Sequence, residues 1–494
     1  MQKLLTKSKY LQGLQCSKLL WISVNDKTRI PKPSVSTEAI FKAGNLIGVL
    51  ATKVFKNGID LSELDFKENI KQTKDALRKR KPIFEAGFLE GRLFSRADIL
   101  LPVVRGKWDI IEVKSSTEIK DVNLHDISFQ KYTYEKAGLK IRKCILMHVN
   151  NQYVRSGNII PVDLFVQSDV TEKVAEYSEG IGGRISKMLE VIDSDEPEGK
   201  IGVCCSDPYV CSLKSECFRD VPKGSVFDFY RMLKVKKFGL WDSDICKLND
   251  VPEDVELNSK QKIQRRLAFD SGVHIDKRGI SNFLKNLKYP IYYLDFETIN
   301  PVLPKFDGMK PYQRIPFQFS LHIQSKNGDL RHYSFLAEGT GDPRIEFMME
   351  LKRLLKKRGS IVVYNQGFEK GVMNEGVTAF PEFREWYDEN VLPRIVDLLD
   401  VFREFYYYDP AQKGSCSIKA VLPVMSDLSY GEMEIGEGML ASCEFERVTY
   451  GNVEEEERVR VREALERYCE LDTLAEVEIV GALRKELKGS GGEK

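Results

Sequence analysis

The sequence predicts an α/β protein with two such domains, because short apolar strands alternate with helical patterns along its 494 residues. Residues 291–294 form an apolar run of the length and type that is buried within a sheet. A second run, at 361–364, leads directly into a helical pattern. In the first third of the chain, strand-like runs at 81–103 and 106–116 precede another helix. A chain of this length has room for two or three domains, each with its own core.

The composition is that of an ordinary globular protein, with 42% apolar and 30% charged residues. The formal net charge is +1, so nucleic-acid binding would need local basic patches instead of a global basic field. No apolar stretch approaches the ~18 residues of a membrane span, and the N-terminal residues lack the apolar core of a signal peptide. We therefore expect a cytoplasmic protein that does not enter a membrane.

The N-terminal third has helical patterns before and after its strands. Apolar periodicity predicts three helices before the strands, and these cover residues 8–23, 37–55 and 61–80. A further helix at 125–138 follows the strands and places Gln130 and Tyr134 one turn apart on its surface.

The strands of this region carry acidic residues. Asp98 lies near the end of the first run, while Glu112 and Lys114 lie two residues apart on one face of the second. Glu85, on the preceding strand, would add a third carboxylate. Carboxylate oxygens suit Mg²⁺, and a lysine ammonium offsets the charge that builds up when a phosphodiester is cleaved. The alternative interpretation of Glu112 and Lys114 is a cross-strand charge pair at the surface.

This order of an aspartate, Glu-x-Lys and Gln-x-x-x-Tyr resembles the RecB-type branch of the PD-(D/E)XK nucleases, which includes CRISPR-associated and AddB-type enzymes. The resemblance implies a restriction-endonuclease-like domain over residues 1–221. It also implies that Asp98 and Glu112 bind Mg²⁺ or Mn²⁺ and that Lys114 positions the attacking water.

The same resemblance implies that Gln130 and Tyr134 belong to the Gln-x-x-x-Tyr motif that marks this branch. One feature departs from the branch. Relatives often carry a histidine ligand in the second helix, whereas residues 44–51 contain no histidine here. That ligand is therefore missing or replaced by water.

The chain has ten cysteines, which in a reducing compartment argue for a metal, a cluster or buried thiols instead of disulfides. Cys205, Cys211 and Cys217 are evenly spaced, with five residues between neighbours, and Cys16 lies far upstream. This pattern resembles the iron–sulfur staple of RecB-like nucleases, in which four thiolates hold a 4Fe–4S cluster. The alternatives are unligated thiols and a Cys₄ zinc site, whose usual ligand pairs are more closely spaced. Cys204 is adjacent to Cys205 and is an alternative ligand.

Between the two α/β regions, residues 222–285 have a mixed helical composition and are expected to form a helical connector. Its lysines and arginines either contact a nucleic-acid backbone or belong to an inert linker, and both interpretations stay open.

In the last part of the chain, Asp295 and Glu297 follow the strand at 291–294 and point to the same face. Two carboxylates so close stay ionised together only when a cation lies between them. Far downstream, Tyr468 and Asp472 lie one turn apart on a predicted helix. Between these two segments, Asn365 to Glu369 open a helix after the strand at 361–364.

These three segments, in this order, resemble the exonuclease motifs of the DnaQ-like 3′→5′ exonucleases of the ribonuclease-H fold, in the subclass with a catalytic tyrosine. The resemblance implies a ribonuclease-H-like exonuclease domain over residues 286–488, followed by a flexible tail at 489–494. A β-β-β-α pattern supports it, because a strand pair joined by an Asn-Gly-Asp turn follows the first strand. The implied site residues are the metal ligands Asp295, Glu297, Glu369 and Asp472 and the water-orienting Tyr468.

One of these ligands departs from the family, which usually has aspartate where Glu369 stands. The longer glutamate can hold the metal through a water molecule. Alternatively, Asp397 in the apolar run at 395–402 takes its place. We favour the simpler interpretation of Asp397 as an aspartate at a strand end.

Together the two resemblances imply a metal-dependent nuclease that hydrolyses phosphodiester bonds, with a RecB-like site and a 3′→5′ exonuclease site. The expected partner is nucleic acid, DNA before RNA, and the expected cofactors are a 4Fe–4S cluster and Mg²⁺ or Mn²⁺. Two alternatives remain. The chain could be a catalytically weak nucleic-acid-binding scaffold, or a subunit that acts only with protein partners in DNA repair or CRISPR adaptation.

Overall fold

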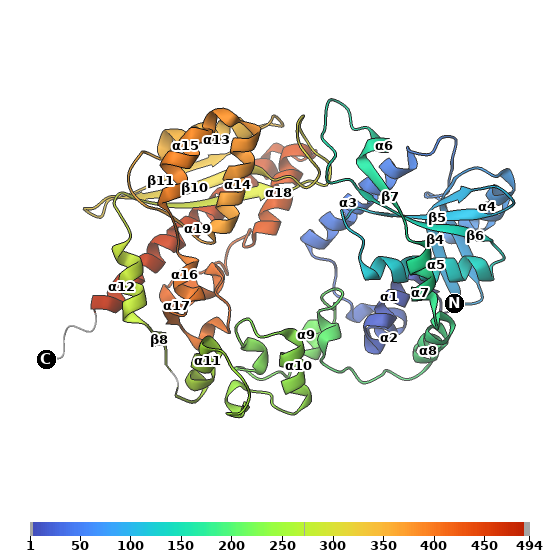
Figure 1. Cartoon of the computed structure of the whole chain (residues 1–494), viewed down its shortest axis with the longest axis horizontal. Coiled ribbons are helices and arrows are strands. Elements are labelled where there is room, and N and C mark those ends of the chain that lie inside the picture. The colour runs from blue at the N-terminus through green and yellow to red at the C-terminus, as the bar shows by residue number, and fades with distance from the viewer. Residues whose placement is uncertain (1–2, 271, 489–494) are drawn as a thin grey trace. The chain divides into compact units, whose positions relative to one another are not determined.

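The computed structural model describes residues 3–270 and 272–488, and the chain divides into two compact units (Figure 1). Unit 1 comprises Met1–Asp220 and Val302–Tyr312, and unit 2 comprises Val221–Pro301 and Gln313–Lys494. Each unit is built on a mixed β-sheet with helices packed against it, so the expected α/β class is confirmed. The predicted tail at 489–494 lies outside the described residues.

The sheet of unit 1 has seven strands in the order β2-β3-β4-β5-β6-β7, and β1 also pairs with β4. Neighbours from β3 to β5 are antiparallel, whereas β5 and β6 are parallel. The strands are β1 (Leu5–Thr6), β2 (Ile59–Asp60), β3 (Ile83–Glu90), β4 (Leu93–Pro102), β5 (Trp108–Lys114), β6 (Ile141–Val149) and β7 (Phe165–Asp169).

Helices cover both faces of this sheet. Ile110 of β5 packs with α4, α5 and α7 on one face, and its neighbour Ile111 packs with α3 on the other. The helices are α1 (Lys7–Gln15), α2 (Ser17–Asn25), α3 (Val35–Thr52), α4 (Phe66–Lys79), α5 (Asp121–Lys136), α6 (Pro161–Leu164), α7 (Thr171–Ser178), α8 (Ile181–Asp193) and α9 (Lys214–Cys217).

The predicted continuous helix at 8–23 is wrong, because the chain breaks at Cys16 into α1 and α2. Cys16 is extended, with φ −162° and ψ 130°. Its N–H donates to the carbonyl of Gln12, and its own carbonyl accepts from the N–H of Leu20, so one residue caps both helices. The apolar periodicity continues across the break, which is why the sequence did not reveal it.

The larger sheet of unit 2 has five strands in the order β11-β10-β9-β12-β13. In this sheet β10 is antiparallel to both of its neighbours, β11 and β9, and β12 runs parallel to both β9 and β13. The strands are β9 (Ile291–Ile299), β10 (Ile315–Gln324), β11 (Leu330–Leu336), β12 (Ile361–Val363) and β13 (Ile395–Asp397).

Helices α13 and α14 lie on one face of this sheet and the long α19 lies on the other (Figure 1). Phe319 and Leu321 of β10 pack with the first pair, while the alternate residues Ser320 and His322 face α19. The helices are α10 (Lys234–Asp242), α11 (Ser259–Asp270), α12 (Lys277–Lys285), α13 (Arg344–Leu354), α14 (Gln366–Ala379), α15 (Arg384–Trp386), α16 (Leu399–Arg403), α17 (Ile418–Met425), α18 (Gly438–Tyr450) and α19 (Glu455–Lys488).

The segment predicted as a connector, 222–285, forms α10, α11 and α12 and belongs to unit 2. Its short strand β8 (His274–Ile275) pairs with β14 (Tyr407–Tyr408). The side chain of Gln264 in α11 also donates to the hydroxyl of Tyr408, at 3.0 Å. These contacts fix the segment against the rest of the unit.

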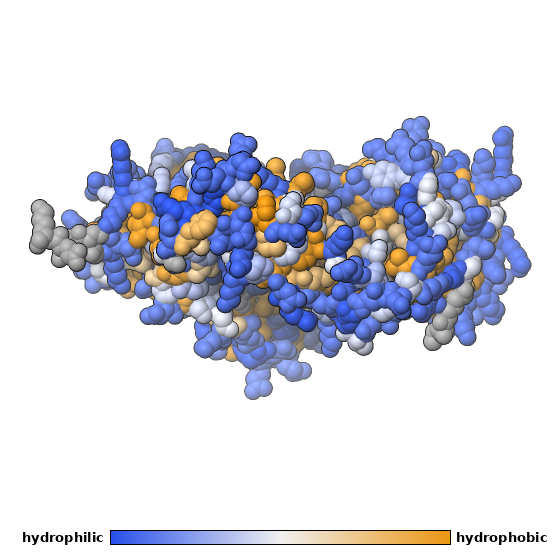
Figure 2. Space-filling view, turned by 90° about the horizontal axis from the view of Figure 1, so that it is seen from below, coloured by the Kyte–Doolittle hydropathy of each residue, from blue (hydrophilic) through white to orange (hydrophobic). Residues whose placement is uncertain are grey.

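The face of the molecule seen in Figure 2 is mainly hydrophilic, with apolar residues scattered among charged ones. Within the part of the chain that the structure describes, no helix combines the length and apolar character needed to cross a membrane.

Candidate active sites

In unit 1, β5 and α5 bring together most of the residues singled out in the first third of the sequence. Lys114 donates to Glu112 Oε1 at 2.6 Å and to Asp126 Oδ2 at 2.8 Å. Gln130 Nε2 donates to Glu112 Oε2 at 2.6 Å, and the hydroxyl of Tyr134 donates to Gln130 Oε1 at 3.2 Å. Glu112 and Lys114 share the face of β5 that packs against α5, so this network is buried between strand and helix.

Two members of this network, Lys7 and Asp126, were missed by sequence reasoning. The ammonium of Lys7 lies 2.9 Å from Glu112, 3.8 Å from Asp126 and 3.9 Å from Asp98. Asp126 could have been found, since it precedes Gln130 by one turn on the same helix face. Lys7 carries no local signal, because it reaches the site only through the pairing of β1 with β4.

The pKa values of the carboxyl groups in this site are shifted in opposite directions. Burial and the charge of Glu112 raise the pKa of Asp98 to about 7. Burial alone would raise the pKa of Glu112 as well, but Lys114 and Lys7 hold it well below its usual range. Asp98 Oδ2 also accepts from the N–H of Val113 at 2.7 Å. The site therefore keeps one firmly ionised carboxylate between two ammonium groups.

Glu85 lies at the edge of the same site. It stands on β3 with φ 56°, and the β3–β4 ladder skips it and the facing Asp98. Burial raises the pKa of Glu85. The charge of Lys7 lowers this pKa and that of Glu112 raises it, so Glu85 is close enough to interact with the charged groups of the site.

The four predicted cluster ligands also come together in unit 1. Cys16, Cys211 and Cys217 pack around one small apolar core. Cys205 joins them, because its carbonyl accepts from the N–H of Cys211 at 3.0 Å and its charge acts on both Cys211 and Cys217. Burial raises the pKa of Cys211 and of Cys217, so these thiols favour the protonated form unless a metal binds them. Cys204 borders the same group.

Unit 2 contains a cavity of about 220 Å³ at the point where β9, β12, α14, α17 and α19 meet. Its lining includes every exonuclease-type residue predicted from the sequence. The predicted lining residues are Asp295, Glu297, Glu369, Tyr468 and Asp472, and they are joined by Asn365, Lys419 and Glu476.

Three of these carboxylates form a compact group. One oxygen each of Asp295, Glu297 and Asp472 lies within 4.8 Å of the others, although Asp472 is more than 170 residues from the other two in the sequence. The hydroxyl of Tyr430 donates to Asp472 Oδ1 at 2.6 Å, and Tyr468 adds a further side-chain hydrogen bond to Asp472. Oxygen ligands at this spacing are what a hard divalent cation requires.

Without a cation, these carboxyl groups hold their protons to unusually high pH. Burial and the charge of Asp472 raise the pKa of Glu297 to about 8, and burial raises that of Glu369 to about 8. The pKa of Asp472 rises to about 6, because burial outweighs the hydrogen bond from Tyr430 and the charge of Lys419. The pKa of Asp295 rises well above its usual value through burial and its acidic neighbours.

Two further carboxylates, Glu369 and Glu476, line the cavity and are 2% and 1% exposed. Among the described residues, Glu369 Oε2 and both carboxylate oxygens of Glu476 have no hydrogen-bond partner. Such buried, unsatisfied oxygens are costly unless a ligand occupies the space they face. Sequence reasoning missed Glu476, although it continues the four-residue spacing of Tyr468 and Asp472 along one face of α19.

Asp397, the rival to Glu369, is engaged elsewhere. Its Oδ1 accepts from the N–H groups of Asn365 and Leu399 at 2.9 and 3.1 Å, and its Oδ2 accepts from that of Gln366 at 3.1 Å. It therefore satisfies the first turn of α14 and does not line the cavity.

Lys419 contributes the positive charge of this cavity. Its ammonium lies 5.3 Å from the ring centres of both Tyr430 and Tyr468 and donates to the carbonyl of Gly436 at 2.5 Å.

Comparison with known proteins gives two matches. A family model described as a domain of unknown function (DUF2779) matches residues 292–417, which include Asp295, Glu297 and Glu369 but not α19. The uncharacterized protein UU173 of Ureaplasma parvum serovar 3 is 24% identical over 276 residues, or 52% of this chain. That alignment covers 39% of the Ureaplasma protein, so the chain spans about two fifths of this relative.

Proposed function

We propose that this protein is a metal-dependent nuclease with two catalytic sites, one in each unit. Its substrate is nucleic acid, and we favour DNA over RNA. The observation that carries the proposal is the meeting of Asp295, Glu297 and Asp472 with Tyr468 around one cavity. Sequence spacing alone predicts that Asp295 and Glu297 share one face of a strand and that Tyr468 and Asp472 share one face of a helix. The fold brings these two pairs to the same cavity.

The topology of unit 2 supports a ribonuclease-H-like exonuclease fold. Three antiparallel strands followed by two parallel ones, in the order β11-β10-β9-β12-β13, match what that fold requires. The candidate ligands lie on the central strand β9, on the first turn of α14 and on α19. This is the placement expected of the three exonuclease motifs.

The residues of the cavity fit divalent cations, because Glu369 and Glu476 present buried carboxylate oxygens that have no hydrogen-bond partner in the described part of the chain. Asp295, Glu297 and Asp472 would hold Mg²⁺ or Mn²⁺, with Glu369 and Glu476 as further carboxylates in the lining of the same cavity. Such ions supply an activated water and offset the charge of the leaving oxygen.

The other residues of the cavity have distinct tasks. Tyr468 is placed to orient the attacking water through its hydroxyl, while its partner Asp472 is held in place by Tyr430. Lys419 brings one ammonium to the cavity wall, where it can meet a phosphate oxygen. Burial excludes bulk water from the carboxylates, which strengthens each of these interactions.

The topology of unit 1 likewise supports a restriction-endonuclease-like fold, in which α4 precedes β3, β4 and β5 and α5 leads to the parallel β6. Asp98 and Glu112 would hold the cation, with Glu85 beside them. Lys114 would position the attacking water, and Gln130 fixes the carboxylate of Glu112. Lys7 adds a second ammonium that limits the charge of the site.

For the four clustered cysteines we propose a 4Fe–4S cluster that ties α1 and α2 to the end of unit 1. The anaerobically purified protein should be brown and absorb broadly near ~400 nm. Replacing Cys211 by serine should remove the colour and lower solubility, whereas Cys144→Ser, in the sheet, should retain the colour. A colourless protein with stoichiometric zinc would overturn the cluster.

The proposed activity is tested with end-labelled single-stranded and duplex DNA and RNA. The anaerobically purified protein should degrade at least one of them with Mg²⁺ and stop when EDTA is added. A protein that binds these substrates equally well in Mg²⁺ and EDTA, but cleaves none, is a scaffold or needs a partner, and the proposal fails.

A further inference from the structure

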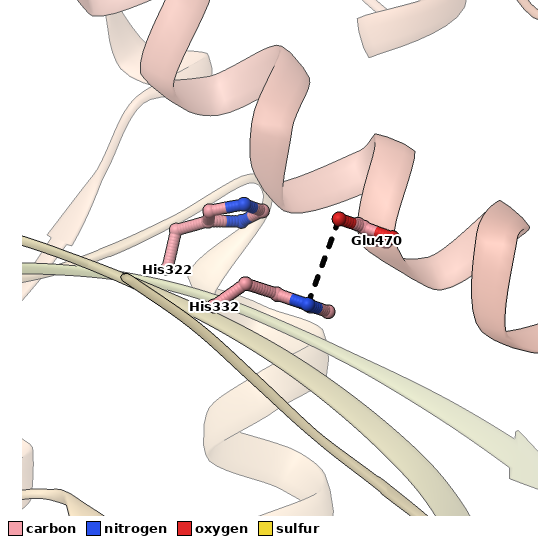
Figure 3. Close-up of side chains that lie close together, drawn as sticks. All are labelled: His322, His332 and Glu470. Atoms are coloured by element: carbon pink, nitrogen blue, oxygen red, sulfur yellow. Dashed lines mark ion pairs between the residues drawn. The ribbon is translucent and has the colours of Figure 1, made fainter. Parts of the chain in front are cut away.

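A second cluster of ligand-type side chains lies on the sheet of unit 2, between β10, β11 and α19. One nitrogen each of His322 and His332 and a carboxylate oxygen of Glu470 lie within 4.8 Å of one another. Figure 3 shows the two imidazole rings one above the other, with the carboxylate of Glu470 facing them from the helix. None of these residues belongs to the carboxylate cavity.

The sheet itself brings the two histidines together. His322 and His332 are direct partners in the antiparallel pairing of β10 with β11, and they are two of only five histidines in the chain. Their ring centres are 4.5 Å apart. Direct cross-strand neighbours point to the same face, and here that face is the one covered by α19.

Hydroxyl groups fix one nitrogen of each ring. His322 Nδ1 lies 2.8 Å from Thr473 Oγ1, and His332 Nε2 lies 2.9 Å from Ser320 Oγ. The two hydroxyls are themselves 2.6 Å apart. Metal-binding histidines are usually held in this way, with the second nitrogen bonded to a neighbouring group that sets the ring orientation.

The remaining nitrogens are open to a ligand. His332 Nδ1 lies 3.6 Å from Glu470 Oε1, which is too long for a hydrogen bond. The hydrogen bond of His322 to Thr473 is made through Nδ1, which leaves Nε2 for a ligand. Burial lowers the pKa of His322 to about 4 and also lowers that of His332, so both rings are neutral and able to coordinate.

We propose that His322, His332 and Glu470 form a zinc site that fastens α19 to β10 and β11. Two imidazoles and one carboxylate are ligands that zinc accepts, with water in the fourth position. Ligands around a tetrahedral zinc lie about 3.3 Å apart, so the group must contract by about 1.5 Å at most. The half-exposed side chain of Glu470 can make that movement.

This site would affect the carboxylate cavity only by fixing the positions of the elements that lie beside the cavity. Thr473 follows Asp472 directly in α19, and Ser320 pairs with Asp295 across the β9–β10 ladder. A zinc ion here would therefore hold α19, which carries Asp472, against β10, the strand that pairs with Asp295 of β9. The proposal does not depend on the chemistry of that cavity.

The test is zinc binding to the full chain after dialysis against a chelator. The wild-type protein should bind one more zinc ion per chain than Glu470→Gln or His332→Asn, with affinity at that site at least about 100-fold weaker in the variants. Thr473→Val, which removes the hydroxyl that bonds His322 and Ser320, should weaken the affinity for zinc by about 10–100-fold. Glu463→Gln, which changes an exposed glutamate two turns before Glu470 that pairs with Arg467, is the matched control and should bind zinc as wild type does.

Cobalt distinguishes this site from the cysteines. The difference spectrum between wild type and Glu470→Gln should show weak visible bands without the strong thiolate absorption that a cysteine site produces. Zinc should also raise the Tm of the wild type more than that of Glu470→Gln. If wild type, Glu470→Gln and His332→Asn bind the same amount of zinc with the same affinity, or if wild type binds none, the zinc site is refuted.

Discussion

The two carboxylate sites of this protein balance their charge in opposite ways. In unit 1, Lys7 and Lys114 both contact Glu112, whose pKa is lowered as a result. In unit 2, five carboxylates surround one cavity in which Lys419 supplies the only ammonium among the described lining residues, and the pKa of Glu297 rises to about 8. The first site balances much of its negative charge with its own lysines, whereas the second has one lysine for five carboxylates.

This difference indicates how each site depends on metal. A buried group of carboxylates without cationic partners either takes up protons or binds cations. At neutral pH without metal, Glu297 and Glu369 should therefore be mostly protonated while Asp472 stays ionised, and metal binding should ionise the whole group. The site of unit 1 keeps Glu112 ionised in either condition, so removal of metal should change it less.

The largest expected effect comes from removing the charge balance of unit 1. Lys114→Ala deletes the ammonium that contacts Glu112 and Asp126, and it should abolish the cleavage due to unit 1 while 3′→5′ shortening continues. The measurement is a product analysis on duplex and single-stranded substrates. Loss of all cleavage in this single variant would show that the two sites are not independent.

A smaller effect is expected from Glu369. Glu369→Gln removes charge while nearly keeping shape, and it should slow 3′→5′ shortening by roughly 10²-fold, as expected for loss of a group that stabilises the transition state electrostatically. Single-turnover kinetics measure this directly.

Asp397→Asn is the matched variant, because it changes charge at the rival position. Since Asp397 bonds three backbone N–H groups, this variant should lower the Tm and leave the chemical step within a few fold of wild type. A silent Glu369→Gln together with an inactive, fully folded Asp397→Asn would move the ligand to Asp397.

Much of the site in unit 2 could be predicted from the sequence, because its residues occur in pairs that are close together in the chain. The alternation of β9 places Asp295 and Glu297 on one face, and the turn of α19 does the same for Tyr468 and Asp472. Glu476 was within reach of the same argument, one turn further along the helix.

What the sequence did not reveal is non-local. Lys7 enters the first site through the pairing of β1 with β4, more than 80 residues away in the chain. The break at Cys16 escaped because the apolar pattern continues through it. The pairing of His322 with His332 depends on the register of β10 with β11, which no single segment specifies.

The smallest expected effect is on stability. Without metal, Glu297 and Glu369 keep their protons up to a pKa of about 8 in the fold, whereas the unfolded chain loses them near pH 4–5. Between these values the folded chain binds more protons, so its free energy of unfolding falls as pH rises, by up to about 1.4 kcal/mol per pH unit for each carboxyl.

Denaturant unfolding in EDTA at pH 5 and pH 8 measures this dependence. Mg²⁺ should restore stability mainly at pH 8, because it binds the ionised carboxylates. In the double variant Glu297→Gln with Glu369→Gln, stability should depend less on pH, with a remaining dependence due to Asp295, Asp472 and Asp98, whose pKa values are also raised. Stability that rises with pH in EDTA, or that Mg²⁺ changes equally at both pH values, would contradict the comparison.

The most direct test of the central claim follows the 3′ end of a labelled strand in Mg²⁺. Wild type and Glu112→Gln, which is altered only in unit 1, should both produce a ladder of products shortened from the 3′ end. Asp295→Asn removes one of the three clustered carboxylates of the cavity, and it should lower the rate of 3′ shortening by about 10³-fold or more. An unchanged ladder in folded Asp295→Asn would show that the cavity of unit 2 is not the exonuclease site.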